Sequence, residues 1–186
     1  MAILTHGQTL QRVTFGHETA AEAKADLRKS LDGDRRRPVK GAIRPTGDSA
    51  DWRHKIIGQL AAYASGQAVD LSDIEIDGSQ WTSFQRQVLS ACRRIPRGSL
   101  WTYGQLAAVC GSPAAARAVG RVMATNPVPL VIPCHRVVGS AGELRGFSAR
   151  GGLGMKERLM QLEGAKLASR RPIRRSRRGN LVGATA

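Results

Sequence analysis

The sequence is poor in cysteine, and the few cysteines it has are far apart. Cys92, Cys110 and Cys134 are the only ones, and no two of them form a C-x-x-C pair. An odd number of widely spaced cysteines is typical of neither a disulfide framework nor a zinc knuckle. The histidines likewise lack a cysteine or carboxylate cluster at metal-ligand spacing. We therefore predict reduced thiols, an intracellular protein and no metal site.

Long apolar runs are also missing. No stretch approaches the roughly 20 apolar residues that cross a membrane, and the first 25 residues lack the apolar segment of a signal peptide. We expect a soluble, cytoplasmic, monomeric protein without a membrane partner. No glycine-rich nucleotide loop or other cofactor motif is present, so we expect no cofactor.

Acidic residues are scarce relative to basic ones. Lys and Arg total 29 against 14 Asp and Glu, a formal net charge of +15 on 186 residues. An excess of this size points to a polyanionic partner, and nucleic acid is the leading candidate. The segment after Gly164 carries several basic residues and no acid, so part of the charge lies in a C-terminal tail.

The chain is predicted to divide into two unequal parts of the α+β (α/β) class. Residues 1–79 read as an α/β module with a hairpin over 3–15, helices over 20–31 and 52–63, a basic loop over 34–48 and a strand over 71–76. Residues 80–165 read as a mainly helical domain after a short polar joint. Residues 166–186 form the basic tail, which we expect to be disordered and to add salt-sensitive DNA affinity.

Two capping boxes mark helices in the second part. Thr82 with Gln85 begins one helix, and Thr102 with Gln105 begins another. Ser112 is predicted to cap the next helix, with a proline at its first position. Helices joined by a tight Gly-Ser turn indicate a helix-turn-helix. By itself this is a weak DNA signal, because alanine-rich helices with two arginines are common solvated faces, but the charge excess strengthens it.

A cysteine and a histidine follow an apolar segment, residues 128–132, which predicts a buried strand. A thiol of pKa about 8.5 is mostly protonated at neutral pH, so Cys134 needs a neighbouring base, and His135 is the nearest candidate. Consecutive strand side chains point to opposite faces, so a bridging water would carry the proton. Glu157, predicted on the apolar side of the last helix, would orient the imidazole. Asn126 would hold the cysteine loop through side-chain hydrogen bonds to the backbone.

The run 81–164 resembles the C-terminal domain of the O6-alkylguanine-DNA alkyltransferases, also called methylated-DNA–protein-cysteine methyltransferases. The motifs that carry this resemblance are, in chain order, TYGQLA, AARAVG, NPVP, IPCHRVV and GGLGMKERL, and their spacing also matches. The N-terminal 80 residues resemble the variable accessory domain of the family only loosely. The resemblance implies a ribonuclease-H-like N-terminal domain and a winged-helix-like second domain.

The resemblance also implies a function, direct reversal of DNA damage. The alkyl group of O6-alkylguanine, and by extension of O4-alkylthymine, would pass irreversibly to Cys134 after the base is flipped out of duplex DNA bound through the minor groove. His135 would act as base through water, Glu157 would complete the relay and Asn126 would order the active-site turn. Arg117 would fill the gap left by the flipped base and Tyr103 would rotate the target phosphate. Further implied DNA contacts are Gln85, Gly104, Ser112, Ala114, Ala115 and Ser140.

The substrate pocket departs from the family pattern. Phe147 stands where many members have a tyrosine that hydrogen-bonds the guanine, while Ser148 could still donate to O6. Alkyltransferase-like proteins, which bind the lesion without repairing it, are the nearest alternative. They resemble a version of the family in which another residue stands in place of the acceptor cysteine, and Cys134 argues against that reading. A thiol hydrolase would need an oxyanion hole, and a pure helix-turn-helix regulator would leave Glu157 and the PCHRV run unexplained.

Overall fold

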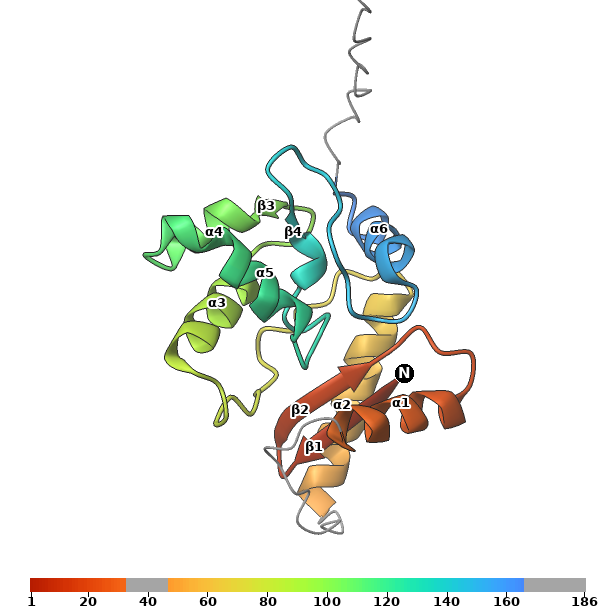
Figure 1. Cartoon of the computed structure of the whole chain (residues 1–186). Coiled ribbons are helices and arrows are strands. Elements are labelled where there is room, and N and C mark those ends of the chain that lie inside the picture. Colours follow the sequence, from red (N-terminus) through yellow and green to blue (C-terminus); the bar gives the residue numbers. More distant parts are fainter. Residues whose placement is uncertain (33–46, 166–186) are drawn as a thin grey trace, which may run out of the picture.

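The computed structural model describes residues 1–32 and 47–165, and it combines helices with two small sheets (Figure 1). The predicted tail and almost all of the predicted basic loop lie outside these residues. This mixed architecture agrees with the α+β class predicted from the sequence. In chain order the elements are β1 (Ala2–His6), β2 (Thr9–Thr14), α1 (Ala20–Asp32), α2 (Gly47–Ala64), α3 (Ser83–Arg93), β3 (Trp101–Thr102), α4 (Tyr103–Val109), η1 (Pro113–Ala115), α5 (Ala116–Ala124), η2 (Cys134–Arg136), β4 (Val137–Val138) and α6 (Gly152–Leu162), with η marking 3₁₀ helices.

The N-terminal part contains the predicted hairpin and both predicted helices. β1 and β2 pair antiparallel, with Ile3 opposite Val13, and Gly7 in their turn takes a φ of 56°. The strand predicted over residues 71–76 is wrong, because only an isolated bridge joins Ile76 to Leu10. A turn interrupts this segment, since the carboxylate of Asp70 accepts hydrogen bonds from the backbone and hydroxyl of Ser72.

The helical part begins where the capping boxes predict. Both boxes are present, on α3 and on α4, and α4 packs against α5 across a tight turn. Ser112 stands at the predicted N-cap position with the proline directly after it, but its side chain makes no capping hydrogen bond, and the element it begins is the 3₁₀ turn Pro113–Ala115 before α5. Residues 143–147, which follow β4, form no strand. Instead the Gly139 amide donates to the Glu143 carbonyl at 2.9 Å and closes a turn.

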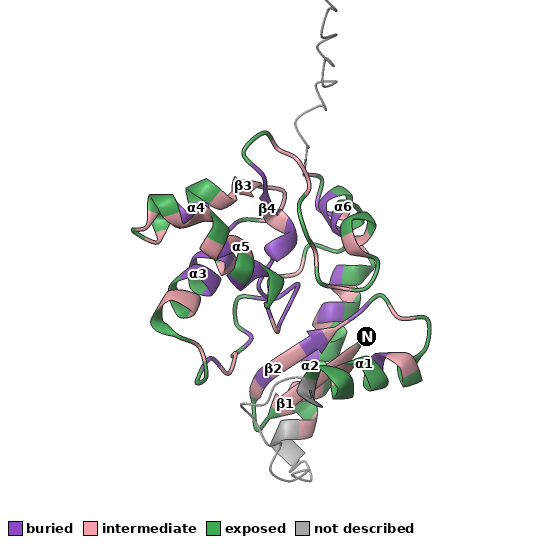
Figure 2. Cartoon of the chain, in the orientation of Figure 1, coloured by how far each residue is buried: buried purple, intermediate pink, exposed green. Residues whose placement is uncertain are grey.

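One hydrophobic cluster runs through both parts of the chain. It includes Leu10 and Leu60 from the N-terminal part and Val88, Leu106 and Val119 from the helical part. Figure 2 shows this buried layer passing from β2 and α2 to α3 and α5. Within the described ranges, no helix is both long and apolar enough to span a bilayer.

Candidate active site around Cys134

A tight loop positions the cysteine, and the strand predicted over residues 128–132 is wrong. The Ile132 amide donates to the Val128 carbonyl at 2.9 Å, and Leu130 sits at a φ of 76°, a left-handed conformation that costs an L-residue roughly 1–2 kcal/mol. The side chain of Asn126 holds this loop closed. Its amide donates to the Ile132 carbonyl at 2.8 Å and its oxygen accepts from the Val128 amide at 3.1 Å. The hydrogen bonds predicted for Asn126 are therefore present.

Cys134 opens the 3₁₀ helix that follows this loop. Its side chain is almost fully buried, with 4% of the residue exposed. Burial raises the pKa of the Cys134 thiol, while a hydrogen bond with Asn126 and the charge of Lys156 act in the opposite direction without cancelling it. At neutral pH the thiol therefore stays protonated, and a base is needed to make it nucleophilic.

His135, the residue after Cys134, is the candidate base of this site. The ring is fully buried, and its Nε2 lies 3.1 Å from Oε1 of Glu163. Burial lowers the pKa of His135 and outweighs the opposing effect of Glu163, so the imidazole is neutral at pH 7. With Nε2–H donating to the carboxylate, the lone pair is on Nδ1. Nδ1 is buried and has no hydrogen-bond partner among the described residues.

The carboxylate predicted for this role, Glu157, is the wrong one. Glu157 is exposed on α6, and so is Leu153 one turn before it, at 45%. The buried stripe of α6 instead runs through Lys156 and Met160 and reaches Glu163 just after the helix ends. These three positions also follow helical spacing, so the buried stripe could be read from the sequence. Its first residue is a lysine, however, which does not look like a buried position.

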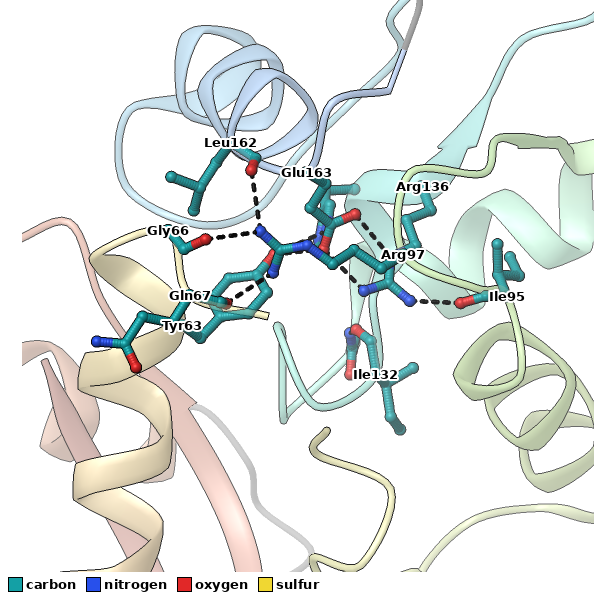
Figure 3. Close-up of polar contacts among 11 residues, drawn as sticks. Tyr63, Gly66, Gln67, Ile95, Arg97, Ile132, Arg136, Leu162 and Glu163 are labelled. Atoms are coloured by element: carbon teal, nitrogen blue, oxygen red, sulfur yellow. Dashed lines mark hydrogen bonds and ion pairs between the residues drawn. The ribbon is translucent and has the colours of Figure 1, made fainter. Parts of the chain in front are cut away.

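Glu163 gathers donors from both parts of the chain (Figure 3). Tyr63 Oη donates to Oε1 at 2.6 Å, and Arg136 donates to Oε1 at 2.7 Å and to Oε2 at 2.9 Å. Burial alone would raise the pKa of Glu163, but the hydrogen bonds from His135, Arg136 and Tyr63 together lower it well below its usual range. The carboxylate is therefore ionised at neutral pH. Sequence reasoning missed both Tyr63 and Arg136.

A buried lysine lies on the other side of the cysteine helix. Lys156 is fully buried and donates to the carbonyls of Val137 at 2.6 Å and Arg145 at 2.9 Å. Burial lowers the pKa of Lys156 to about 8, and the neighbouring Cys134 acts to raise it. Its Nζ also lies 5.9 Å from the ring centre of Tyr103. Lys156 therefore ties α6 to β4 and adds positive charge near the thiol.

The predicted DNA-contacting residues lie at and around the helix-turn-helix. Arg117 on α5 and Ala114 on η1 are exposed at helical spacing, and the half-buried Tyr103 and exposed Gly104 begin α4. Gln85 is half-buried and its side chain accepts from the Thr82 amide within the capping box. Ser112 and Ala115 are half-buried around the turn, and Ser140 is exposed after β4.

An open groove of about 720 Å³ lies between the cysteine loop and the N-terminal part. Asn126, Pro129 and Ser148 line one side, and Val13 and His17 line the other. Phe147 is half-buried, with its ring centre 6.4 Å from that of Phe15. Of the predicted pocket residues, the structure thus places Ser148 in the groove and packs Phe147 against the N-terminal part. No group of three or more His, Cys, Asp or Glu side chains able to hold a metal occurs in the ranges that the structure describes.

A buried cysteine beside a histidine–carboxylate pair, in a domain with a helix-turn-helix, defines a thiol-based site of the nucleophilic type. The family described as 6-O-methylguanine DNA methyltransferase, DNA binding domain, matches residues 83–165. The crystal structure of Mycobacterium tuberculosis OGT in complex with DNA is 31% identical, with a TM-score of 0.64 over 87% of this chain and 84% of that chain. The chain therefore belongs to the methylated-DNA–protein-cysteine methyltransferase family.

Curated relatives carry the same name. The methylated-DNA–protein-cysteine methyltransferase of Mycolicibacterium paratuberculosis is 44% identical over 107 residues, which cover 58% of this chain and 62% of that protein. The protein of this name from Salmonella typhimurium is 45% identical over 106 residues, which cover 57% of this chain and 60% of its own length. The matched region thus spans about three fifths of the curated relatives' length.

Proposed function

We propose that this protein repairs DNA by transferring the alkyl group of O6-alkylguanine in duplex DNA, and that of O4-alkylthymine, to its own Cys134. The observation that carries this proposal is the buried Cys134 beside the His135–Glu163 pair, 3.1 Å between Nε2 and Oε1, in a chain of this family. The names of the relatives supply the substrate class. No other described group combines a buried thiol with a base and a carboxylate.

The residues of the site support a simple displacement. A water molecule between Sγ and Nδ1 would pass the thiol proton to His135, whose Nε2–H stays on the ionised Glu163. Sγ then attacks the alkyl carbon, so that an S–C bond forms and the C–O6 bond breaks with its electron pair leaving on the guanine. Guanine recovers a proton and stays in the DNA. A thioether does not leave from carbon under these conditions, so each molecule reacts once.

The DNA has to be deformed before the thiolate can reach the alkylated base. A thiolate cannot reach O6 inside the stack, so the base must be extruded at a cost of a few kcal/mol. We assign Arg117, exposed on α5, to the space left in the duplex, and Tyr103 to rotation of the target phosphate, in a complex through the minor groove. Gln85, Gly104, Ser112, Ala114, Ala115 and Ser140 would line this contact. In the pocket Phe147 offers no hydroxyl, so Ser148 is the candidate donor to O6.

The finer architecture belongs to the same proposal. Residues 1–79 would be a reduced ribonuclease-H-like accessory domain, residues 80–165 the catalytic domain with a winged-helix-like DNA-binding face, and residues 166–186 a basic tail. The hairpin followed by two helices and the packing of α4 on α5 support the first two assignments. The protein would work as a cytoplasmic, nucleoid-associated monomer.

Transfer from labelled DNA tests the function. The protein is incubated with duplex DNA carrying a labelled methyl group on guanine O6, and the peptide that contains Cys134 is analysed by mass spectrometry. We expect a mass gain of one methyl group on Cys134 and at most one label per molecule. Tight binding to the lesion without label on the protein would instead identify an alkyltransferase-like binder. Continued turnover would identify an enzyme of another class.

Replacing Arg117 by alanine should slow repair of duplex DNA about 10- to 100-fold, because the cost of extrusion is a few kcal/mol and each 1.4 kcal/mol is tenfold in rate. Reaction with free O6-methylguanine base should stay unchanged, because no duplex has to be opened. Single-turnover rates on the two substrates measure this difference. Arg158→Ala, which removes one exposed charge from α6, is the matched control. Equal losses on duplex and free base would contradict the role in extrusion.

A further inference from the structure

A tyrosine from the N-terminal part reaches the centre of the active site. Tyr63 lies near the end of α2, and it is 1% exposed. Its hydroxyl donates to Oε1 of Glu163 at 2.6 Å and lies 3.3 Å from Nε2 of His135. The phenol therefore contacts both members of the His135–Glu163 pair, although it lies 72 residues before His135 in the chain.

An arginine fixes the position of this ring. The guanidinium carbon of Arg97 lies 5.5 Å from the ring centre of Tyr63, a cation–π distance. The same guanidinium donates to the carbonyls of Gly66 at 3.1 Å, Gln67 at 3.0 Å and Leu162 at 3.0 Å. Figure 3 shows Arg97 between the end of α2 and the end of α6. Since Glu163 directly follows Leu162, Arg97 sets the distance between the phenol and the carboxylate.

The hydrogen bonds at Glu163 indicate that the Tyr63 hydroxyl orients the carboxylate, in addition to the packing of its ring. Arg136 donates to both oxygens and is itself bonded to the Ile95 carbonyl, so it holds the carboxylate from one side. Tyr63 and His135 both use Oε1. The two-point bond fixes the carboxylate relative to the guanidinium. Without the hydroxyl, the carboxylate and the guanidinium could shift together relative to His135, and the direction in which Oε1 meets Nε2–H would no longer be fixed.

We propose that Tyr63 is a positioning residue for alkyl transfer: its hydroxyl holds Glu163 in the orientation that keeps Nε2–H of His135 on the carboxylate and leaves Nδ1 free to accept the thiol proton. This inference rests on the proposed function and deepens it. The N-terminal part then supplies a component of the active site. Tyr63 touches neither the thiol nor the substrate in this scheme, and it acts only through Glu163 and His135.

The test compares Tyr63→Phe with the wild-type chain in single-turnover transfer. We expect the maximal rate at saturating DNA to fall about tenfold, equivalent to about 1.4 kcal/mol, while the DNA concentration that gives half the maximal rate stays the same. Ile56→Val, a buried change on α2 away from the site, is the control for destabilisation, and its rate per folded molecule should match wild type. The His135 Nε2–H proton resonance should also move in Tyr63→Phe and stay in place in Ile56→Val.

The outcomes separate the two proposals. A wild-type chain that transfers no label overturns the proposed function. A wild-type chain that transfers normally, with Tyr63→Phe at full rate and an unmoved Nε2–H resonance, overturns only the role of Tyr63. If Tyr63→Phe folds poorly, Arg97→Lys replaces it, because lysine keeps the charge but loses the planar group that bonds three carbonyls. A severalfold lower maximal rate in Arg97→Lys supports the proposal, and a full rate overturns it.

Discussion

Replacing Glu163 by glutamine is expected to slow alkyl transfer about 100- to 1,000-fold, the range for loss of one charged partner in proton transfer. The amide is neutral, so it no longer stabilises the imidazolium that forms when His135 takes the thiol proton. Glu157→Gln is the matched control, since Glu157 is exposed on α6 and should change the rate by less than about twofold. Single-turnover rates on duplex DNA carrying O6-methylguanine give both values.

The fraction of folded protein must be measured alongside these rates. Removing the charge leaves the Arg136 guanidinium without its buried partner, and breaking such a pair costs about 3–5 kcal/mol. Circular dichroism during chemical denaturation gives the free energy of unfolding, and the rate is then expressed per folded molecule. A normal rate in folded Glu163→Gln, or a large loss in Glu157→Gln, would contradict the assignment of Glu163.

The stability of Glu163→Gln is expected to depend on pH differently from that of the wild-type protein. The folded-state pKa of Glu163 lies below its unfolded value, so the ionised group stabilises the protein above the unfolded pKa of about 4.3, and this contribution is lost as the pH falls. The difference in unfolding free energy between wild type and Glu163→Gln should therefore be constant near neutral pH and shrink below about pH 4. A difference that grows on acidification would contradict the lowered pKa.

Replacing Cys134 by alanine is expected to abolish transfer completely and to leave binding to lesion-containing duplex DNA within about twofold of wild type. The thiol is the group that forms the new S–C bond, and no other side chain stands in its place. Alanine fills most of the same buried volume, so the loop closed by Asn126 should keep its shape. Label counting and electrophoretic mobility shifts measure the two properties.

The other two cysteines provide the matched controls. Cys92 is fully buried on α3, where burial raises its pKa well above the usual value, and Cys110 is partly exposed at the end of α4. Cys92 lies near enough to Cys134 to feel its charge, but neither Cys92 nor Cys110 follows the loop that Asn126 closes, so Cys92→Ala and Cys110→Ala should each still accept one methyl group per folded molecule. Residual labelling of Cys134→Ala would show that another residue is the acceptor.

Short-range sequence patterns predicted the elements that depend on neighbouring residues. The capping boxes at Thr82 and Thr102 predicted the starts of α3 and α4, and the hairpin followed from alternation around Gly7. The segment before Cys134 has the composition of a strand, yet short-range hydrogen bonds close it into a loop. The Asn126 side chain replaces strand pairing there, and Leu130 accepts a left-handed conformation.

The active site was only partly predictable because its parts are far apart in the sequence. Cys134, His135 and Asn126 lie within one short run and were found. Glu163 was missed because the buried stripe that leads to it starts with Lys156, a residue type that is rarely buried. The apolar face of α2 indicates that Tyr63 is buried, but nothing there indicates that its hydroxyl will meet a carboxylate 100 residues later.

The bond between Tyr63 and Glu163 changes where the chain can be cut. The sequence predicts a boundary between the two parts near residue 79. A fragment that starts there would lose Tyr63, and the Arg97 guanidinium would lose two of its three carbonyl partners. Chimaeras with relatives should therefore keep α2 together with the helical part. By its contacts, α2 is part of the catalytic unit.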